Sequence, residues 1–108
     1  MPSVTQKVTL KLIKGYVVAV PKRIPNRTIG DKLRFDCKEG KFQVVFDRWI
    51  FAGKDHPITD RRARTIRRRG PYEIECYIED PSVKGTRGVP QASYGYKKGA
   101  GGHGNVKP

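Results

Sequence analysis

The chain has 108 residues, enough for one domain with a single hydrophobic core and too few for two. Hydrophobic residues make up 36% and charged residues 31%, and no run of about 18 apolar residues suggests a membrane span. The formal net charge of +13 favours anionic partners such as nucleic acid or acidic lipid surfaces. The first twenty residues alternate in polarity, so we expect a cytoplasmic location, or a secreted one if a leader was removed.

Four short strands are predicted in the first half of the chain, at residues 8–12, 15–21, 32–37 and 41–46. Each alternates apolar with polar side chains or is rich in β-branched residues, which is typical of strands with one buried face. In residues 32–37 this phase turns Leu33, Phe35 and Cys37 inward. The proline-containing stretch between the second and third strands indicates a loop, and Gly40 indicates a hairpin between the third and fourth.

Residues 47–60 form a connection that we expect to pack on the core through Trp49 and Phe51. An arginine segment follows, with six arginines between residues 61 and 69. It can be drawn as a helix that Asp60 caps and Gly70 ends, or as a strand with Ile66 pointing inward. We prefer the strand, because a helix would turn only Ala63 and Ile66 toward a core.

The clearest strand lies at residues 71–80, where Tyr72, Ile74, Cys76 and Ile78 alternate with polar residues. A long loop follows, and then a short strand in which Tyr94 and Tyr96 precede Lys97 and Lys98. Aromatic and basic residues in this order occur in single-strand binders. We favour the alternative, an edge strand whose tyrosines pack on the sheet.

The chain closes with a glycine-rich stretch at residues 99–108. We expect it to be mobile unless Val106 docks on the sheet. The predicted organisation is therefore one all-β domain at residues 1–98, followed by a tail at residues 99–108.

Two stretches resemble a known family. "IGDKLRFDCKEGKFQVVFD" is similar to a strand, hairpin and strand in the middle of cupredoxins such as plastocyanin, and "TIRRRGPYEIECY" resembles the stretch that delivers their copper-binding cysteine. The positions matched without a gap in the second stretch are Thr65, Ile66, Gly70, Tyr72, Ile74 and Cys76. The two stretches cover residues 29–47 and 65–77. The resemblance implies a cupredoxin-like Greek-key β-sandwich. A small OB-like or SH3-like barrel is the alternative fold, because the size and charge of the chain suit it.

The resemblance also implies that the copper centre is lost. A blue-copper site uses two histidines, a cysteine thiolate and usually an axial methionine. Cys76 matches the cysteine, but the first histidine position falls on Phe42 or Gln43. No histidine or methionine occurs in the fourteen residues after Cys76, and Met1 is the only methionine. We therefore expect no metal and no cofactor, and keep a copper or redox role for Cys76 as an alternative.

Cys37 and Cys76 are the only cysteines, and they offer no zinc-binding CxxC pair. The favoured interpretation of Cys76 is a buried apolar residue, since free cysteine is often found in cores. A disulfide between Cys37 and Cys76 is the alternative, because both side chains share the inward phase. No catalytic motif is recognisable, and His56 and His103 have no nucleophile beside them in sequence, so we expect no enzyme activity.

The function expected is therefore that of a non-catalytic, strongly basic binding module. Its partner would be a polyanion, with nucleic acid favoured over an acidic protein, because arginine engages phosphate with two parallel hydrogen bonds. The candidate contacts are Arg61, Arg62, Arg64, Arg67, Arg68, Arg69, Lys97 and Lys98. The alternative is a structural or protein-interaction module whose charge only maintains solubility, with the arginine segment discouraging edge-to-edge pairing of sheets.

Overall fold

The computed structural model describes residues 3–82 and 95–108, and the regular elements in these ranges are all strands. They are β1 (Thr5–Ile13), β2 (Tyr16–Val20), β3 (Arg27–Thr28), β4 (Lys32–Cys37), β5 (Phe42–Phe46), β6 (Arg64–Thr65), β7 (Gly70–Glu79), β8 (Tyr96–Lys98) and β9 (Gly102–Lys107). The prediction of an all-β fold is confirmed, and the helical alternative for the arginine segment is wrong. No helix among the described residues is long and apolar enough to cross a membrane.

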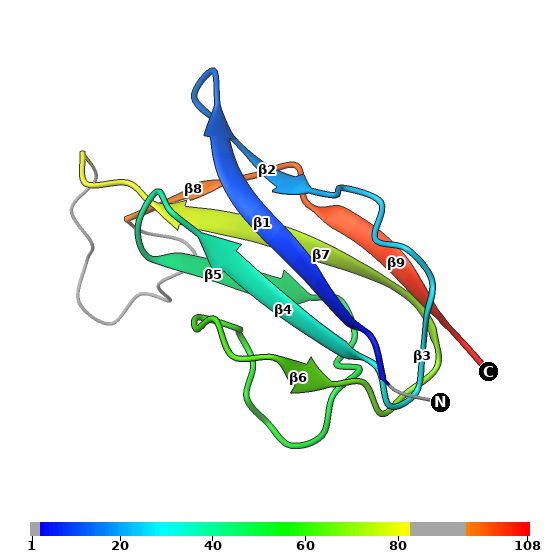
Figure 1. Cartoon of the computed structure of the whole chain (residues 1–108). Coiled ribbons are helices and arrows are strands. Elements are labelled where there is room, and N and C mark those ends of the chain that lie inside the picture. Colours follow the sequence, from blue (N-terminus) through cyan, green and yellow to red (C-terminus); the bar gives the residue numbers. More distant parts are fainter. Residues whose placement is uncertain (1–2, 83–94) are drawn as a thin grey trace.

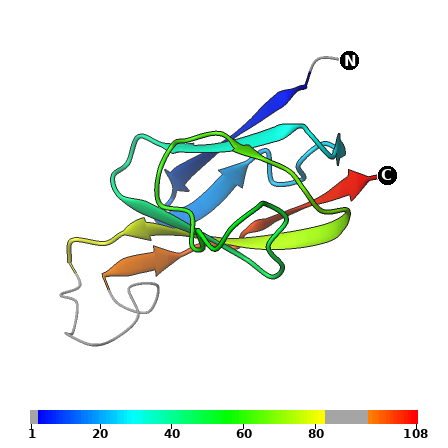
Figure 2. The ribbon, with the colours of Figure 1, turned by 90° about the horizontal axis from the view of Figure 1, so that it is seen from below.

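The strands form two mixed sheets that are stacked in a sandwich-like arrangement (Figures 1 and 2). The first sheet has the order β2-β1-β4-β6, and the second has the order β3-β9-β7-β5 with β8 also paired to β7. β1 and β4 are parallel neighbours. Between β2 and β4 the chain crosses to the second sheet and forms β3 there, parallel to β9. This crossing lets β4 return to the first sheet parallel to β1.

The core lies between the sheets and follows the period-two pattern of the sequence. Leu33, Phe35 and Cys37 from the first sheet are at most 1% exposed, and Ile74 and Cys76 from the second are at most 3% exposed. Phe46 at the end of β5 is the centre of an aromatic cluster, with ring centroids 5.9 Å from Phe35, 5.4 Å from Phe51 and 5.7 Å from Tyr72. Burial of aromatic side chains at this density is a large part of the stabilising free energy of such a small core.

The glycine-rich C-terminal stretch is part of the second sheet. β9 lies between β3 and β7, and Val106 is buried at 1% exposure. Glycine permits this close approach, because a Cβ atom on Gly101 would lie 2.0 Å from the carbonyl oxygen of Ile74, and one on Gly104 would lie 2.4 Å from the hydroxyl of Tyr72. The expected tail at residues 99–108 is therefore corrected: Val106 docks, and residues 102–107 are a strand.

Candidate anion-binding surface

The connection between β5 and β6 places the arginine segment on the core. Its anchors are Ile50 and Phe51, which are 0% and 2% exposed, as the sequence predicted for Phe51. The side chain of Trp49 packs on this core from its edge. His56 Nε2 accepts a hydrogen bond of 3.0 Å from the backbone N–H of Phe46, so this histidine fastens the connection to the end of β5. The arginine segment therefore begins from a connection that is fixed to the core and to the end of β5.

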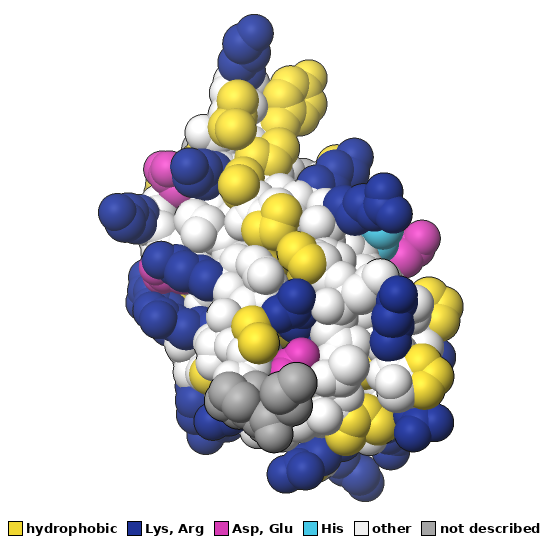
Figure 3. All heavy atoms as spheres, turned by 45° about the vertical axis from the view of Figure 1, so that its right-hand side comes forward, with side chains coloured by type: hydrophobic (Ala, Val, Ile, Leu, Met, Phe, Trp, Pro, Cys, Tyr) yellow, Lys and Arg dark blue, Asp and Glu magenta, His cyan; other side chains and the backbone are white. Residues whose placement is uncertain are grey.

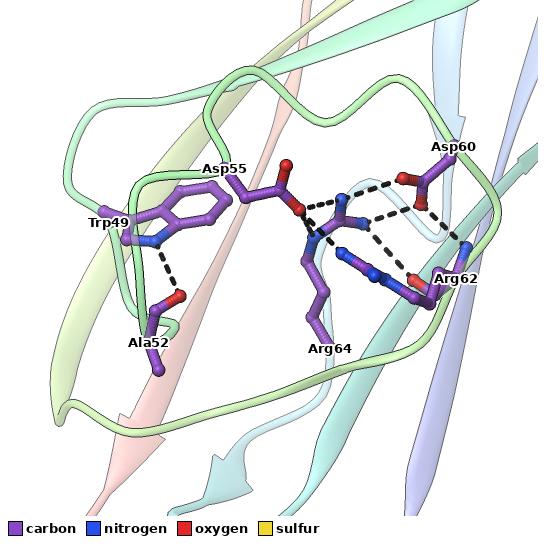
Figure 4. Close-up of polar contacts among 6 residues, drawn as sticks. All are labelled: Trp49, Ala52, Asp55, Asp60, Arg62 and Arg64. Atoms are coloured by element: carbon purple, nitrogen blue, oxygen red, sulfur yellow. Dashed lines mark hydrogen bonds and ion pairs between the residues drawn. The ribbon is translucent and has the colours of Figure 1, made fainter.

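Arg64 does not face solvent. It pairs with Leu33 of β4, and its side chain is 7% exposed because it lies beneath the connection (Figure 4). Its guanidinium donates from Nη1 and Nη2 to the two carboxylate oxygens of Asp60, at 3.0 and 3.1 Å, and from Nε to Asp55 Oδ2 at 3.0 Å. Arg62 Nη2 donates to the same Asp55 oxygen at 2.9 Å. We call Asp55, Asp60, Arg62 and Arg64 the arginine–aspartate cluster.

The cluster neutralises its own charge. The hydrogen bonds from Arg64 are the main cause that holds the pKa of Asp55 and the pKa of Asp60 below the usual range of a carboxyl group. Burial opposes the charge of Arg64, but its bonds to Asp60 and Asp55 outweigh this and raise the pKa of the guanidinium. Arg64 is consequently an anchor of the fold, and we leave it out of the surface that meets a partner.

Arg61 is tied to the first sheet. Its Nε donates to Asp36 Oδ1 at 2.6 Å, its Nη2 donates to the carbonyl of Cys37, and its guanidinium lies 5.9 Å from the ring centroid of Phe42. Lys7 approaches the same carboxylate, with Nζ 3.4 Å from Asp36 Oδ2. The bond from Arg61 is the main cause that lowers the pKa of Asp36, so this carboxylate offsets part of the local positive charge.

The last three arginines are presented differently. The backbone N–H groups of Arg67 and Arg68 both donate to the carbonyl of Ile50, at 2.8 and 3.1 Å, while the side chains of Arg67, Arg68 and Arg69 are exposed. Arg48 reaches over the start of β7, where a Cβ atom on Gly70 would lie 2.5 Å from its Nη1. We call these four arginines the basic end. Within the described part of the chain none of them forms an ion pair, so their charges are free to meet an anion.

A hollow of about 340 Å³ lies beside the basic end. Arg62, Arg64 and Arg67 contribute to its wall, together with Asp55 and the side chain of Phe51. Because Arg62 and Arg64 are paired with aspartates, the positive charge that this hollow offers to a phosphate or carboxylate group comes mainly from Arg67. Its single carboxylate is already engaged by two arginines.

Lys97 and Lys98 do not join the basic end. They lie on β8, which pairs with residues 77–79 at the far end of β7, whereas Arg67, Arg68 and Arg69 precede Gly70 at the near end. At about 3.3 Å per residue, the seven residues from Gly70 to Tyr77 separate these lysines from the basic end by about 23 Å. Lys98 also approaches a carboxylate, with Nζ 3.5 Å from Glu75 Oε1. The predicted contact residues therefore occupy at least two separate places. Of the two tyrosines before them, Tyr96 opens the edge strand β8, and Tyr94 lies outside the described residues.

The outer face of the first sheet is basic, whereas that of the second sheet mixes glutamates of β7 with Lys98 and Lys107. The outward positions of the first sheet include Lys7 and Lys11 on β1 and Lys32 and Arg34 on β4, with Asp36 as their one acidic neighbour on these strands. The outward positions of β7 in the second sheet carry three glutamates, Glu73, Glu75 and Glu79. Sequence reasoning overlooked the basic sheet face and Arg48. The signal was present, since Lys7, Lys11, Lys32 and Arg34 share the polar phase of their strands.

No protein-family model and no curated protein matches this chain. The cupredoxin resemblance therefore stays a prediction. Of the two stretches that resemble cupredoxins, residues 29–47 contain β4 and β5, and residues 65–77 overlap β6 and β7. Each stretch therefore supplies strands to both sheets.

Both cysteines are free and 0% exposed. The disulfide between Cys37 and Cys76, kept open from the sequence, is therefore not formed in this structure. Burial raises the pKa of the Cys76 thiol to about 12, because an apolar environment disfavours the charged thiolate. Cys76 is thus held as a neutral thiol between Ile74 and Ile78.

The residues around Cys76 do not fit a blue-copper centre. Copper requires two imidazoles close to the cysteine sulfur, but Phe42 is a core residue and His56 is hydrogen-bonded to the backbone of Phe46. His103 is exposed on β9. Among the described residues, no group of three or more histidine, cysteine, aspartate or glutamate side chains is placed to hold a metal ion.

Proposed function

We propose that this protein is a non-catalytic binding module that contacts the phosphates of a nucleic acid through its basic end. The observation that carries the proposal is the arrangement of Arg67, Arg68, Arg69 and Arg48, whose exposed side chains gather beside the start of β7 without an ion pair among the described residues. The planar fork of arginine is pre-organised, so less rotamer entropy is lost for each hydrogen bond to a phosphate than with lysine.

The remaining arginines support the contact from behind. Arg62 is 69% exposed although one nitrogen meets Asp55, so its other nitrogens can still donate to a phosphate. Arg64 carries no contact itself, but it holds the wall of the hollow in which Arg62 and Arg67 lie. Lys32 pairs with Thr65 of β6 and so extends the positive charge from the basic end onto the face of the first sheet.

The contacts we propose are to the backbone of the nucleic acid. Stacking on single-stranded bases needs exposed aromatic rings, and Tyr16 is the only aromatic residue among the large exposed hydrophobic side chains described. Tyr16 of β2 pairs with Ile13 at the C-terminal end of β1, whereas the basic end lies beside Thr5 and Lys32 at the other end of that strand. Charge at fixed positions without stacking favours a duplex or another regular polyanion.

We further propose that the scaffold is a cupredoxin-like Greek-key sandwich that carries no copper centre. Two mixed sheets and a parallel β1–β4 pair support a sandwich with crossing connections. The side chains of Asp55, Asp60 and His56 all form hydrogen bonds that hold the connection between β5 and β6 in place. This supports a role without catalysis.

The test is a salt titration of binding. Fluorescence anisotropy of labelled duplex DNA, single-stranded RNA and heparin would be recorded between about 50 and 300 mM salt. A variant with Arg67→Ala, Arg68→Ala and Arg69→Ala should reduce the slope of log affinity against log salt by about 2 to 3, because each lost phosphate contact removes about 0.9.

A matched control removes three charges elsewhere. Lys38, Lys41 and Lys97 are exposed and lie away from the basic end, and their change to Ala leaves the net charge equal to that of the arginine variant. The control should keep most of the slope. Equal losses in both variants would contradict a defined site. Salt-independent binding of a protein, with weak binding to all three polyanions, would favour the alternative of a protein-interaction module.

A further inference from the structure

The hairpin of β1 and β2 projects beyond the rest of the sandwich (Figure 1). Ile13 pairs with Tyr16 and Leu12 with Val17, so the turn consists of Lys14 and Gly15 alone. Both turn residues have positive φ, 51° and 81°, as two-residue hairpin turns require. Such a turn is tight, so the apolar residues beside it are presented on a stiff support.

The tip of this hairpin is apolar on both faces. Ile13 and Tyr16 occupy the outward phase and are 48% and 71% exposed, while Leu12 occupies the opposite phase and is 39% exposed. The apolar surface continues along β2, where Val20 shares the phase of Tyr16 and is 43% exposed. Figure 3 shows hydrophobic side chains on both sides of the projecting hairpin and a basic side chain at its tip. Contiguous exposed apolar surface of this kind indicates a binding site.

The charge around the tip is positive. Lys11 and Lys14 belong to the hairpin, and Lys97 comes close, with Nζ 3.8 Å from the position that a Cβ atom on Gly15 would take. The first acidic residue of the chain is Asp31, so β1, β2 and their turn carry no negative charge. An anionic surface would therefore meet lysines here and no carboxylate from the hairpin.

We propose that the hairpin tip inserts into the headgroup region of an anionic lipid bilayer, with Leu12, Ile13 and Tyr16 among the acyl chains and Lys11, Lys14 and Lys97 at the phosphates. A tip that is apolar on both faces is covered completely by a fluid layer, whereas a flat protein surface would cover only one face. The two residue pairs nearest the turn span about 7 Å, which is the depth of interfacial insertion. The ammonium of Lys14 reaches back to the headgroups along its flexible stem.

This surface is independent of the basic end. The tip lies past the pair Leu10–Cys37, while the basic end lies beside the pair Thr5–Lys32 at the other end of the same strands. The two sites can therefore be tested separately.

The experiment is flotation of the full chain with large unilamellar vesicles. One set contains phosphatidylcholine alone, and the other contains about one third phosphatidylserine. We expect binding to the anionic vesicles and at least tenfold weaker binding to the neutral ones. The variant Ile13→Ser/Tyr16→Ser should lose at least tenfold in partition, because it removes apolar area and keeps the charge. The variant Lys11→Gln/Lys14→Asn should lose about fivefold for each lysine.

Three controls keep the result interpretable. Val4→Ser/Ile29→Ser removes apolar residues of similar exposure, 48% and 44%, away from the tip and should leave partition unchanged. The arginine triple variant should still bind vesicles. Tyr16→Trp should show a blue-shifted emission on anionic vesicles that the parent chain, whose Trp49 packs on the core, does not show.

Two outcomes would overturn the proposal. Full vesicle binding by Ile13→Ser/Tyr16→Ser, checked for folding by circular dichroism, would mean that only charge adsorbs the protein. Absence of binding to anionic vesicles, with a dimer in sedimentation velocity that the same variant abolishes, would mean that the hairpin pairs two copies of this chain.

Discussion

Arg64 and Asp60 are joined by two parallel hydrogen bonds, from Nη1 to Oδ1 at 3.0 Å and from Nη2 to Oδ2 at 3.1 Å. The guanidinium is 7% exposed and the carboxylate 51%, so the pair lies at the boundary between core and solvent. It closes the connection after β5 onto β6, and a planar fork is needed to do so. Arg64, although arginine is usually exposed to solvent, is therefore a structural residue in this fold.

Replacing this fork by a single ammonium should destabilise the protein. Arg64→Lys keeps the charge but cannot bind Asp60 and Asp55 in the same geometry, and we expect the free energy of unfolding to fall by about 1 to 2 kcal/mol. Urea unfolding followed by circular dichroism measures this. Arg67→Lys is the control, since Arg67 has no ion pair among the described residues, and its effect should stay within about 0.5 kcal/mol. Equal effects would contradict the assigned role of Arg64.

Stability should decline in acid because of the paired carboxylates. The folded-state pKa values of Asp36, Asp55 and Asp60 are lowered, chiefly by arginine hydrogen bonds, below the ordinary value of 3.8. Their stabilising contribution is therefore present above that value and is lost as the pH falls through the folded-state pKa values. Urea unfolding between about pH 2.5 and 6 should show the loss setting in below about pH 4. Asp60→Asn should show a shallower decline, and an unchanged slope would contradict this.

The cysteines should resist modification in the folded protein. Cys37 and Cys76 are 0% exposed, so the reagent cannot reach either sulfur, and the pKa of Cys76 is raised to about 12, so its thiol stays neutral near pH 8. Ellman's reagent should find no reactive thiol in the native protein and both thiols in guanidinium chloride. If no thiol reacts after denaturation without reductant, the two cysteines form a disulfide instead.

A methyl group at Gly101 should be far more damaging than one at Gly53. The two glycines have nearly the same φ, 81° and 80°, so alanine pays a similar conformational cost of about 1 to 2 kcal/mol at either position. At Gly101 the Cβ would also lie 2.0 Å from the carbonyl oxygen of Ile74, whereas nothing lies within 4 Å at Gly53. Thermal unfolding should therefore show a clearly larger loss for Gly101→Ala, and equal losses would contradict the docking of the C-terminal stretch.

The local pattern of the sequence predicted β1, β2, β4, β5 and β7 and the direction of many of their side chains, but it placed β3 in a loop and β9 in a mobile tail. Leu33, Phe35 and Cys37 are buried as their alternation predicts, and Ile66 is buried as the strand interpretation predicts. This works because successive side chains of a strand point to opposite faces, so one buried face leaves a period of two in the sequence.

Contacts between distant segments were decided by the tertiary structure. The neutralisation of Arg64 needs Asp55 from the connection packed above it, and the separation of Lys97 from Arg67 follows from the length of β7 between them. Val106 is buried because Gly101 and Gly104 let β9 approach β7 closely. Such contacts depend on how the chain crosses between two sheets, which local alternation does not encode. The sequence by itself therefore determined most of the longer strands and the inward phase of many core residues, and only the tertiary structure decided the docking of β9 and which charges remain free.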